Sequence, residues 1–458
     1  MDLDPSTQSS DQISVFGDVT VENGAKILAT PGSQIVPDGS SFTVLTHEGD
    51  LTGAFEIADG TFVDYEIEYK DDAVLITTNL NLNASGSGLN GTENQVAAQQ
   101  LVSAVLLAEG GLPGGNFNVI GGGALSGSDF DQVHSELYGA AVHAIQRGGL
   151  SFGLAMKDRL GDREQCGTLR GYGQESCRPG NEVASDSDFW LQGAYRREEL
   201  DTRLALDTTI DSLGIYGGLD SRQGHATVGL AGGVDFSTVD DPLGEADSLS
   251  IHAGGYISQP LAFFNLNAMA SYNFGSFEAK RNVNIGALSG TGTADQNVGR
   301  ISGEVSLTQE YQNPTGIEIQ PEFGVSYQRI AMDGFNEGGT LGNVALTVND
   351  FEWNDTSVFA GVSLRQAFKD SSNTIIPEVR VNYQRSLSED DYEFSTKFTS
   401  FATAPVTILS ETPKAVWSIG AGLNLENGFG MVAFGDIDYR FSDINNELAA
   451  QGGIRLRF

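Results

Sequence analysis

The sequence predicts a mainly β protein whose second half, residues 188–458, is a 12-stranded antiparallel transmembrane β-barrel. Three observations lead to this fold class. Apolar and polar residues alternate in one long run after another, the chain ends on such a run, and only 40% of the residues are hydrophobic. Because a membrane barrel hides its apolar surface at every second position, its average hydropathy stays low.

The alternating runs recur through the second half and are long. In residues 264–274, for example, Phe264, Leu266 and Tyr272 share one face, and Asn265 and Asn267 lie on the other. Similar runs cover residues 213–219, 226–236, 249–257, 301–311, 317–327, 358–368, 415–425 and 431–441. Many approach the roughly 10 residues that cross a bilayer at a tilt, whereas strands of soluble proteins are usually about 5 or 6 residues long. The pattern favours a membrane barrel over the alternative, a soluble acidic β-sandwich.

Twelve or 13 candidate strands can be counted between Asp188 and Phe458. Single-chain bacterial barrels have an even number of strands. We therefore expect 12, with residues 341–352 as the most doubtful strand. The polar segments at residues 282–296 and 387–411 are expected to be exposed loops.

The last strand stops at an aromatic residue. Ile454, Leu456 and Phe458 fall on one face, while Arg455 and Arg457 fall on the other. This ending resembles the C-terminal signature of bacterial outer-membrane barrels. The resemblance implies that Phe458 is the signal read by the barrel-assembly machinery.

Three helices are expected before the barrel, the first over residues 93–107. Residues 129–145 form an amphipathic pattern with Val133, Leu137, Ala141 and Ile145 on one face. After two glycines, residues 150–163 form a third helical segment. Without the barrel, an ordinary surface helix would be the simplest interpretation of this segment.

Composition and motif searches argue against several function classes. The net charge of −36 makes nucleic acid a poor partner, because phosphate binding needs clustered Lys and Arg. No run of about 20 apolar residues is present to form a membrane-spanning helix. The glycine pattern GxGxxG at residues 86–91 lacks a βαβ unit, so a flexible linker is favoured over a dinucleotide site. We expect no catalytic residue, cofactor or metal site, because the five histidines are scattered.

An ordered set of short motifs carries a family resemblance. The set comprises Phe189-Trp190-Leu191-Gln192-Gly193, Gly214-Ile215-Tyr216-Gly217-Gly218, Val228-Gly229-Leu230-Ala231-Gly232, His252-Ala253-Gly254-Gly255-Tyr256, Pro321-Glu322-Phe323-Gly324-Val325 and Pro377-Glu378-Val379-Arg380-Val381. This order, ending in Phe458, resembles the translocator domain of a classical (type Va) autotransporter. No single motif is strong, but the set extends over the whole predicted barrel.

The resemblance implies that residues 150–163 form a helix inside the pore. The run that resembles the family's pore helix is Met156, Lys157, Asp158, Arg159, Leu160, Gly161 and Asp162. Its bases Lys157 and Arg159, with Arg163, would then meet acids facing the lumen. The candidate lumen acids are Glu304, Glu310, Glu318 and Glu322.

The N-terminal region is expected to fold differently from the barrel. Residues 15–27 look like a rung of a parallel β-helix, and residues 42–76 resemble the autochaperone cap of an autotransporter passenger. The expected division is therefore a β-helix end and cap at 1–80, a linker with amphipathic helices at 81–149, a pore helix with its loop at 150–187, and the barrel at 188–458. Because no signal peptide is visible, we expect a processed or excised fragment of an exported protein.

The two cysteines, Cys166 and Cys177, both lie in the loop that follows the pore helix. In an exported protein, such a pair is most simply a local disulfide. A metal site would need further ligands, and no histidine lies nearby in sequence.

The function implied by the resemblance is export and display of the N-terminal passenger at the cell surface by a monomeric outer-membrane module. Its expected partners are outer-membrane lipid, the barrel-assembly machinery, periplasmic chaperones and its own passenger. Two alternatives remain at this point: a plugged outer-membrane channel or porin, and a surface adhesin with a short β-helical binding domain. Related translocators cut themselves with a pore-helix asparagine, but residues 130–180 contain none, and Leu154 stands nearest its expected position.

Overall fold

The computed structural model describes residues 2–4, 9–31, 39–57, 63–80, 92–108, 127–162, 187–201, 208–223, 225–285, 288–370, 373–388, 390–427 and 431–457. Among these residues, no helix combines the length and the apolar character needed to cross a membrane.

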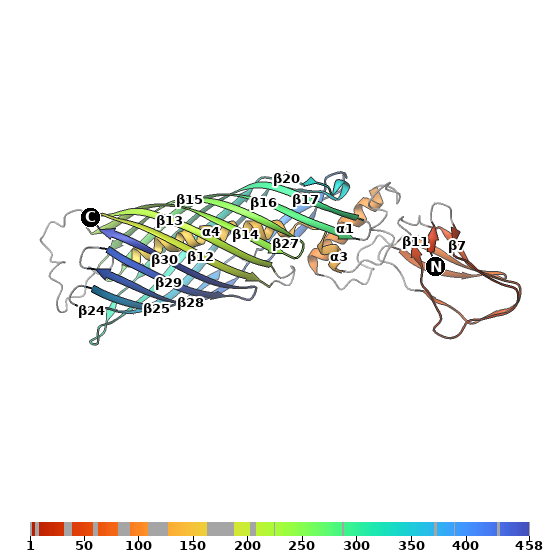
Figure 1. Cartoon of the computed structure of the whole chain (residues 1–458), viewed down its shortest axis with the longest axis horizontal. Helices are drawn as coiled ribbons and strands as arrows, with labels where there is room; N and C mark the ends of the chain where they lie inside the picture. Colours follow the sequence, from red (N-terminus) through yellow and green to blue (C-terminus); the bar gives the residue numbers. More distant parts are fainter. Residues whose placement is uncertain are drawn as a thin grey trace.

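Twelve antiparallel strands of the described chain close into one barrel, which confirms the predicted number (Figure 1). The strands are β12 (Ser187–Leu200), β13 (Thr208–Gln223), β14 (Ala226–Asp241), β15 (Gly244–Pro260), β16 (Asn265–Ile285), β17 (Leu288–Thr308), β19 (Ile317–Met332), β23 (Phe351–Gln366), β25 (Asn373–Ser386), β28 (Ala415–Asn427), β29 (Met431–Phe441) and β30 (Asn445–Arg457). Each pairs with the next, and β12 pairs with β30 from Asp188↔Arg457 to Leu200↔Asn445, so the barrel has no open edge.

The alternation of the sequence becomes an apolar outside and a polar inside. In β15, Leu249 and Ile251 are exposed, whereas Ser250 and His252 are buried in the lumen. In the last strand, Ile454 and Leu456 are each 40% exposed and Arg455 between them is 7% exposed. The faces of this strand are therefore as predicted, and Phe458 lies outside the described residues.

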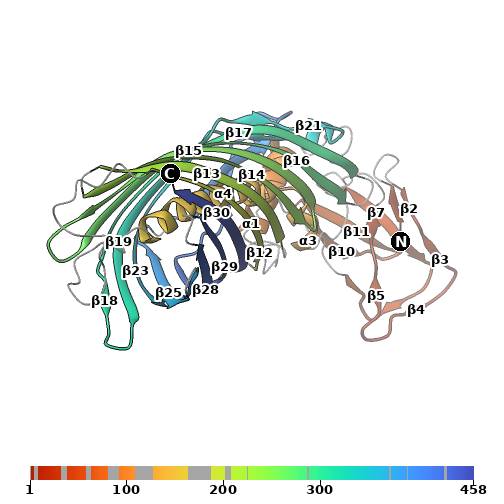
Figure 2. The same cartoon turned by 60° about the vertical axis from the view of Figure 1, so that its left-hand side comes forward.

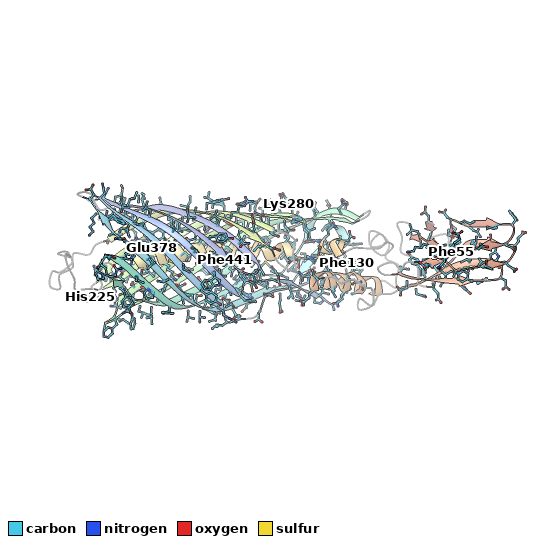
Figure 3. All side chains as sticks on the ribbon, turned by 90° about the horizontal axis from the view of Figure 1, so that it is seen from below. Phe55, Phe130, His225, Lys280, Glu378 and Phe441 are labelled. Carbon is cyan, nitrogen blue, oxygen red and sulfur yellow. The ribbon has the colours of Figure 1, made fainter. Side chains whose placement is uncertain are left out.

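The barrel has two distinct ends. The terminal end holds the start of β12, the end of β30 and the turn at His225. The opposite end, called the helix end below, faces the N-terminal region. Figure 3 shows Phe130 at the helix end and His225 at the other.

Segments expected to be loops or a barrel strand form other structure at the helix end. Residues 282–296 continue the β16–β17 hairpin up to the pair Ile285↔Leu288, so the expected loop is wrong. Residues 387–411 contain β26 (Tyr392–Phe398) and β27 (Val406–Ser410). Residues 341–352 supply β22 (Leu346–Val348) and the start of β23, not an additional barrel strand. These strands form because their own apolar residues, such as Phe394, pack over the mouth of the barrel.

A four-stranded sheet lies at this mouth, in the order β20 (Phe335–Asn336), β22, β26 and β27. Residues 335–348, which contain β20, β21 (Gly338–Gly339) and β22, are called the strap below. The strap connects β19 to β23 and folds back onto β17, where Gly338 pairs with Thr293.

The helices before the barrel include the one expected at residues 93–107, but the other two differ from their expected bounds. They are α1 (Glu93–Ala108), the short α3 (Gly127–Asp131) and one continuous α4 (Glu136–Asp162). The predicted break at Gly148 and Gly149 is wrong, although glycine costs a free helix about 1 kcal/mol relative to alanine. Inside the barrel the surrounding wall supplies the packing, and Gly149 leaves room for the side chain of Arg300, which a Cβ atom would meet.

The N-terminal unit consists of two stacked turns of parallel β-structure with a cap. Strands β3 (Ile13–Val15), β4 (Val19–Thr20) and β5 (Lys26–Ile27) pair in parallel with β7 (Ser41–His47), β8 (Leu51–Thr52) and β9 (Glu56–Ile57), respectively. The antiparallel strands β10 (Val63–Tyr69) and β11 (Ala73–Leu80) then cover β7. Short strands β1 (Asp2–Asp4), β2 (Ser9–Ser10) and β6 (Thr30–Pro31) complete the unit. Figure 2 shows it beyond the helix end of the barrel.

Candidate functional site

Helix α4 occupies the lumen and runs lengthwise through it, from Glu136 at the helix end to Asp162 at the terminal end (Figures 1 and 2). It contacts the wall formed by β13, β14, β15, β16 and β17. Its apolar side chains Phe152, Met156 and Leu160 are buried against Trp190 and neighbouring aromatic residues of that wall. Gly161 and Asp162 form the last two positions of the helix.

The terminal end of α4 is held by Arg159, which is 2% exposed. Its Nε and Nη2 atoms donate to Asp220 Oδ2 at 3.2 and 3.1 Å, and Nη2 lies 3.5 Å from Asp188 Oδ2. Tyr256 also donates to Asp220, at 2.8 Å, and accepts a hydrogen bond from Trp190 Nε1 at 3.0 Å. The guanidinium group therefore ties the helix to β12, β13 and β15.

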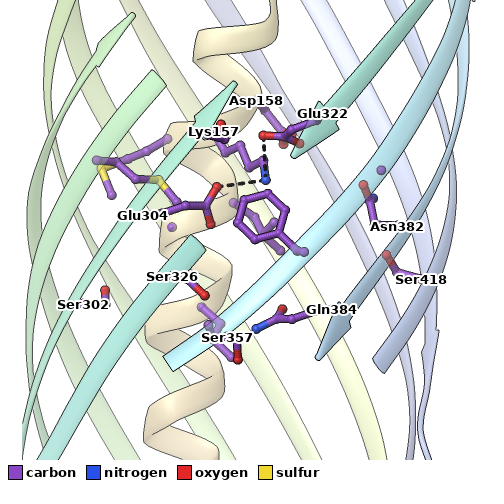
Figure 4. A pocket seen from close by; sticks show the side chains of 18 of the residues that line it. Lys157, Asp158, Ser302, Glu304, Glu322, Ser326, Ser357, Asn382, Gln384 and Ser418 are labelled. Carbon is purple, nitrogen blue, oxygen red and sulfur yellow. Dashed lines mark ion pairs between the residues drawn. The ribbon is translucent and has the colours of Figure 1, made fainter. Parts of the chain in front are cut away.

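Two residues earlier in the helix, Lys157 bridges two of the predicted lumen acids (Figure 4). Its Nζ atom lies 2.9 Å from Glu304 Oε1 on β17 and 3.0 Å from Glu322 Oε1 on β19. The same ammonium group lies 4.0 Å from the centre of the Phe359 ring on β23, a cation–π distance. The structure thus joins the helix through Lys157 to three strands.

The other two predicted acids have a different partner. Arg365 of β23 donates to Glu318 Oε1 at 2.5 Å, and its Nη2 atom lies 3.5 Å from Glu310 Oε1. These two acids therefore have a cationic partner on the barrel wall. Arg163, Cys166 and Cys177 lie outside the described residues.

The helix-end half of α4 is held by residues that the sequence analysis missed. His143 Nε2 lies 3.0 Å from Glu198 Oε1, Arg147 Nε lies 3.4 Å from Glu198 Oε2, and Arg147 also pairs with Glu447. Arg196 donates to the backbone oxygen of Arg147 at 3.1 Å. The alternation of the sequence could have indicated these two wall residues, because Arg196 and Glu198 occupy the same face of β12 as Trp190.

A cavity of about 300 Å³ remains beside α4, lined by α4 and by the wall strands from β16 round to β30. Lys157, Glu304 and Glu322 line it from one side. Arg380 of β25 lines it from the other and pairs with Asp436 at 2.8 Å and Asp438 at 2.5 Å. The lumen is therefore wider than the helix, and much of the remaining space is bordered by paired charges.

The arrangement is suited to holding a polypeptide segment. The three cationic side chains of α4 each meet carboxylates from two strands, so the helix is fixed along its length. Within the described ranges, no three His, Cys, Asp or Glu side chains gather in a way that could hold a metal ion. The geometry is that of a filled pore.

Comparison with known proteins identifies this architecture. The autotransporter beta-domain family matches residues 189–438. The translocator domain of the autotransporter NalP from Neisseria meningitidis has a similar fold, with a TM-score of 0.54, 18% identity, and coverage of 70% of this chain and 99% of that one. The beta domain of the Bordetella autotransporter BrkA has a TM-score of 0.45 and 16% identity, with coverage of 59% of this chain and 99% of that one. The transport unit of the autotransporter AIDA-I from Escherichia coli has a TM-score of 0.39 and 15% identity, with coverage of 61% of this chain and 93% of that one.

No significant match was found among curated protein sequences. The family match nevertheless covers more than half of the chain, and it falls on the strands that build the barrel around α4. The chain therefore belongs to the autotransporter beta-domain family, and its barrel is an outer-membrane barrel of type V secretion.

Proposed function

We propose that this chain exports its N-terminal region through the outer membrane and displays it at the cell surface. The observation that carries the proposal is the path of the chain. Helix α4 runs through the lumen, and the segments before it lie at the helix end, opposite the start of β12 and the end of β30 (Figure 1). If the terminal end faces the periplasm, the N-terminal unit stands outside the cell.

The N-terminal unit fits the role of the end of a passenger. Its parallel strands make two stacked β-helical turns, and β10 and β11 cover the edge of β7 that the second turn would otherwise leave open. Covered edges favour folding over aggregation, which suits a segment that must fold after leaving a pore. We assign no enzymatic role to this chain.

The expected partners follow from the same role. Exposed aliphatic and aromatic side chains on the barrel wall require lipid, and export across the periplasm requires chaperones and the barrel-assembly machinery. Closure of all twelve strands within one chain suits a monomer. The net charge of −36 is unsuited to binding nucleic acid.

The test is surface exposure in intact cells. An epitope placed in the turn between β10 and β11, at Asp71, should be bound by antibody without permeabilisation. The same epitope at His225, at the terminal end, serves as the matched control and should be reached only after permeabilisation. Protection of both epitopes would contradict export and favour the plugged-channel alternative.

A further inference from the structure

The outer helices, α1 and α3, fill a binding site made by parts of the barrel. The amide group of Asn94 pairs twice with the backbone of β27: Nδ2 donates to the Leu409 oxygen at 2.7 Å, and the Leu409 N–H donates to Oδ1 at 2.8 Å. Asn94 is completely buried. The Asn94 amide therefore pairs with the backbone of β27 in the way that a peptide group of a neighbouring strand would.

The start of α1 is built to present this amide. The Thr92 N–H donates to Gln95 Oε1 at 3.0 Å and the Gln95 N–H donates to Thr92 Oγ1 at 3.3 Å, which is a reciprocal capping box. The Gln95 amide also donates to both carboxylate oxygens of Asp131, at 3.0 and 3.1 Å. The two outer helices are thus tied to each other as well as to the barrel.

Apolar packing completes the contact. Leu101, Val102 and Val105 of α1 are fully buried, together with Phe130 at the end of α3. They share one core with residues that the barrel strands, the strap and β26 contribute. These are Val283, Leu341, Val344, Ala345, Leu346 and Phe398.

A buried ion pair fixes the strap in place beneath the outer helices. Arg281 of β16 binds Glu337 of the strap through Nε at 2.8 Å and Nη2 at 2.7 Å. Arg281 also donates to the backbone oxygens of Gln132, just after α3, and Val344. Tyr138 of α4 donates to Glu337. One ion pair therefore joins the barrel wall, the strap and the pore helix.

We propose that the outer helices form a retaining lock, which binds the mouth of the barrel from outside once these helices have passed through the lumen. This inference rests on the proposed export function. Under that function, α1 and α3 are exported, whereas β16, β27 and the strap belong to the barrel. The site and its occupant therefore meet only after the outer helices have crossed the lumen, and their contact prevents α4 from sliding back.

The lock contains a buried acid that makes it sensitive to pH. Glu136, at the start of α4 and level with the hairpin turns outside the membrane, accepts a hydrogen bond from Asn94 Nδ2 at 3.2 Å. Burial raises the pKa of Glu136 to about 9, with further contributions from Asp241, Asp131 and Glu411. His134 and Arg281 border the same small space. Burial also raises the pKa of Asp241.

The raised pKa of Glu136 makes the lock less stable at alkaline pH. A carboxyl group whose pKa is raised by folding stabilises the folded state fully below its unfolded pKa of 4.5. That contribution is lost as the pH rises toward 9, because the deprotonated group is poorly solvated in the lock. The outer helices should therefore open more often in alkaline medium.

The experiment measures thiol labelling on intact cells that carry the full chain without Cys166 and Cys177. Ser103→Cys places a nearly isosteric thiol at a position that is 4% exposed, and Gln100→Cys places one at an exposed position of the same helix. A membrane-impermeant maleimide is applied at pH 6 and pH 9. The ratio of the two labelling rates cancels the reagent's own pH dependence, and heat modifiability shows that each variant has assembled.

At pH 6, Ser103→Cys should react at least about tenfold more slowly than Gln100→Cys, because labelling requires local opening. The labelling rate of Ser103→Cys divided by that of Gln100→Cys should rise at pH 9. In chains that also carry Glu136→Gln, this ratio should stay low at pH 9. Asn94→Ala should raise the ratio at both pH values, and so should Gln95→Glu, because it places a carboxylate that is ionised at both pH values beside Asp131. Equal labelling of Ser103→Cys and Gln100→Cys at pH 6 would overturn the lock, and an unchanged pH response in Glu136→Gln would overturn the role of Glu136 in its pH sensitivity.

The epitope at Asp71 separates this result from failure of the export function. If that epitope is exposed and Ser103→Cys reacts as fast as Gln100→Cys, export stands and the lock fails. If the epitope is protected, and Gln100→Cys is unreactive on intact cells, the export function itself fails and the lock fails with it.

Discussion

Single charged residues decide how α4 is held. Lys157 is 24% exposed, and its two partners, Glu304 and Glu322, are less than 20% exposed. Removing one member of a buried pair leaves the others poorly solvated, so such losses cost more than a surface ion pair does. The residues on the outside of the wall provide the contrast, because Arg329 and Glu352 are about half exposed.

Lys157→Met should therefore loosen the pore helix. Two carboxylates would then face each other without a cation, at a cost of roughly 1–3 kcal/mol after discounting for partial exposure. Single-channel conductance in planar bilayers should increase. Adding Glu304→Gln and Glu322→Gln should restore the low conductance, and Arg329→Met should leave it unchanged. If conductance is the same in Lys157→Met and the parent chain, the bridge does not hold the helix.

The absence of asparagine from the pore helix predicts that the passenger stays attached. Backbone cleavage by an asparagine side chain needs that residue in a fixed position, and Leu154 stands there instead. Purified outer membranes should show one band near the full 48.6 kDa. Appearance of a fragment whose N-terminus lies between Gly149 and Arg163, without added protease, would contradict this.

How far the sequence predicts such contacts depends on register. The positions of Glu304 and Glu322 on the lumen face follow from alternation alone, which is why a meeting with Lys157 could be anticipated. The partner of Glu318 could not, because it depends on the pairing of β19 with β23. That register places Arg365 directly opposite Glu318. Alternation tells which face a residue occupies, but not which residue stands beside it.

At the scale of elements, α4 shows how the surroundings change a local preference. Gly148 and Gly149 predict a break, yet the helix continues through both. The barrel wall approaches the helix closely here, and the side chains of Asp235 and Arg300 leave little room for residues larger than glycine. The strands at the mouth show the same effect. Residues 387–411 are polar on average, but Tyr392 and Phe394 alternate into a core that exists only once the barrel has formed.

Deleting residues 150–163 should open the pore. These residues include Lys157 and Arg159 and the apolar contacts to Trp190, so their loss leaves the lumen wide at the terminal end. Assembled protein, selected by heat modifiability, should show raised conductance, and cells should become more sensitive to large antibiotics. Deletion of residues 2–80 is the control and should change neither. Unchanged conductance after removal of 150–163 would mean that the segment does not obstruct the pore.

At the scale of the whole molecule, charge is distributed unevenly. The chain has 25 Lys and Arg residues against 61 Asp and Glu residues. Several of the few cations, including Arg147, Arg159 and Arg365, are buried within the barrel. Outside the apolar face of the barrel wall, acidic side chains therefore outnumber basic ones, which favours solubility of the exposed parts.

Assembly of the whole barrel should depend on Phe458. By its place in the alternation this residue belongs to the apolar face of the closing strand, with Ile454 and Leu456. Deletion of Phe458, or Phe458→Asp, should reduce heat-modifiable barrel in the outer membrane and leave degraded chain in the periplasm. Phe458→Tyr, which keeps the aromatic ring, should assemble nearly normally. Normal levels of both disruptive variants would contradict the role of this residue.

The β12–β30 pairing also makes the molecule a mechanical anchor. The seam closes around α4, and α4 continues along the chain toward β12, so a pull on the displayed end is directed along the axis of the barrel. The load falls first on the ion pairs of Arg147, Lys157 and Arg159, which lie at successive levels and would be sheared in turn. Beyond them it reaches β12, which is hydrogen-bonded along its length to both β13 and β30. Under the proposed export function, detaching the displayed N-terminal unit by force would therefore require tearing β12 out of the wall.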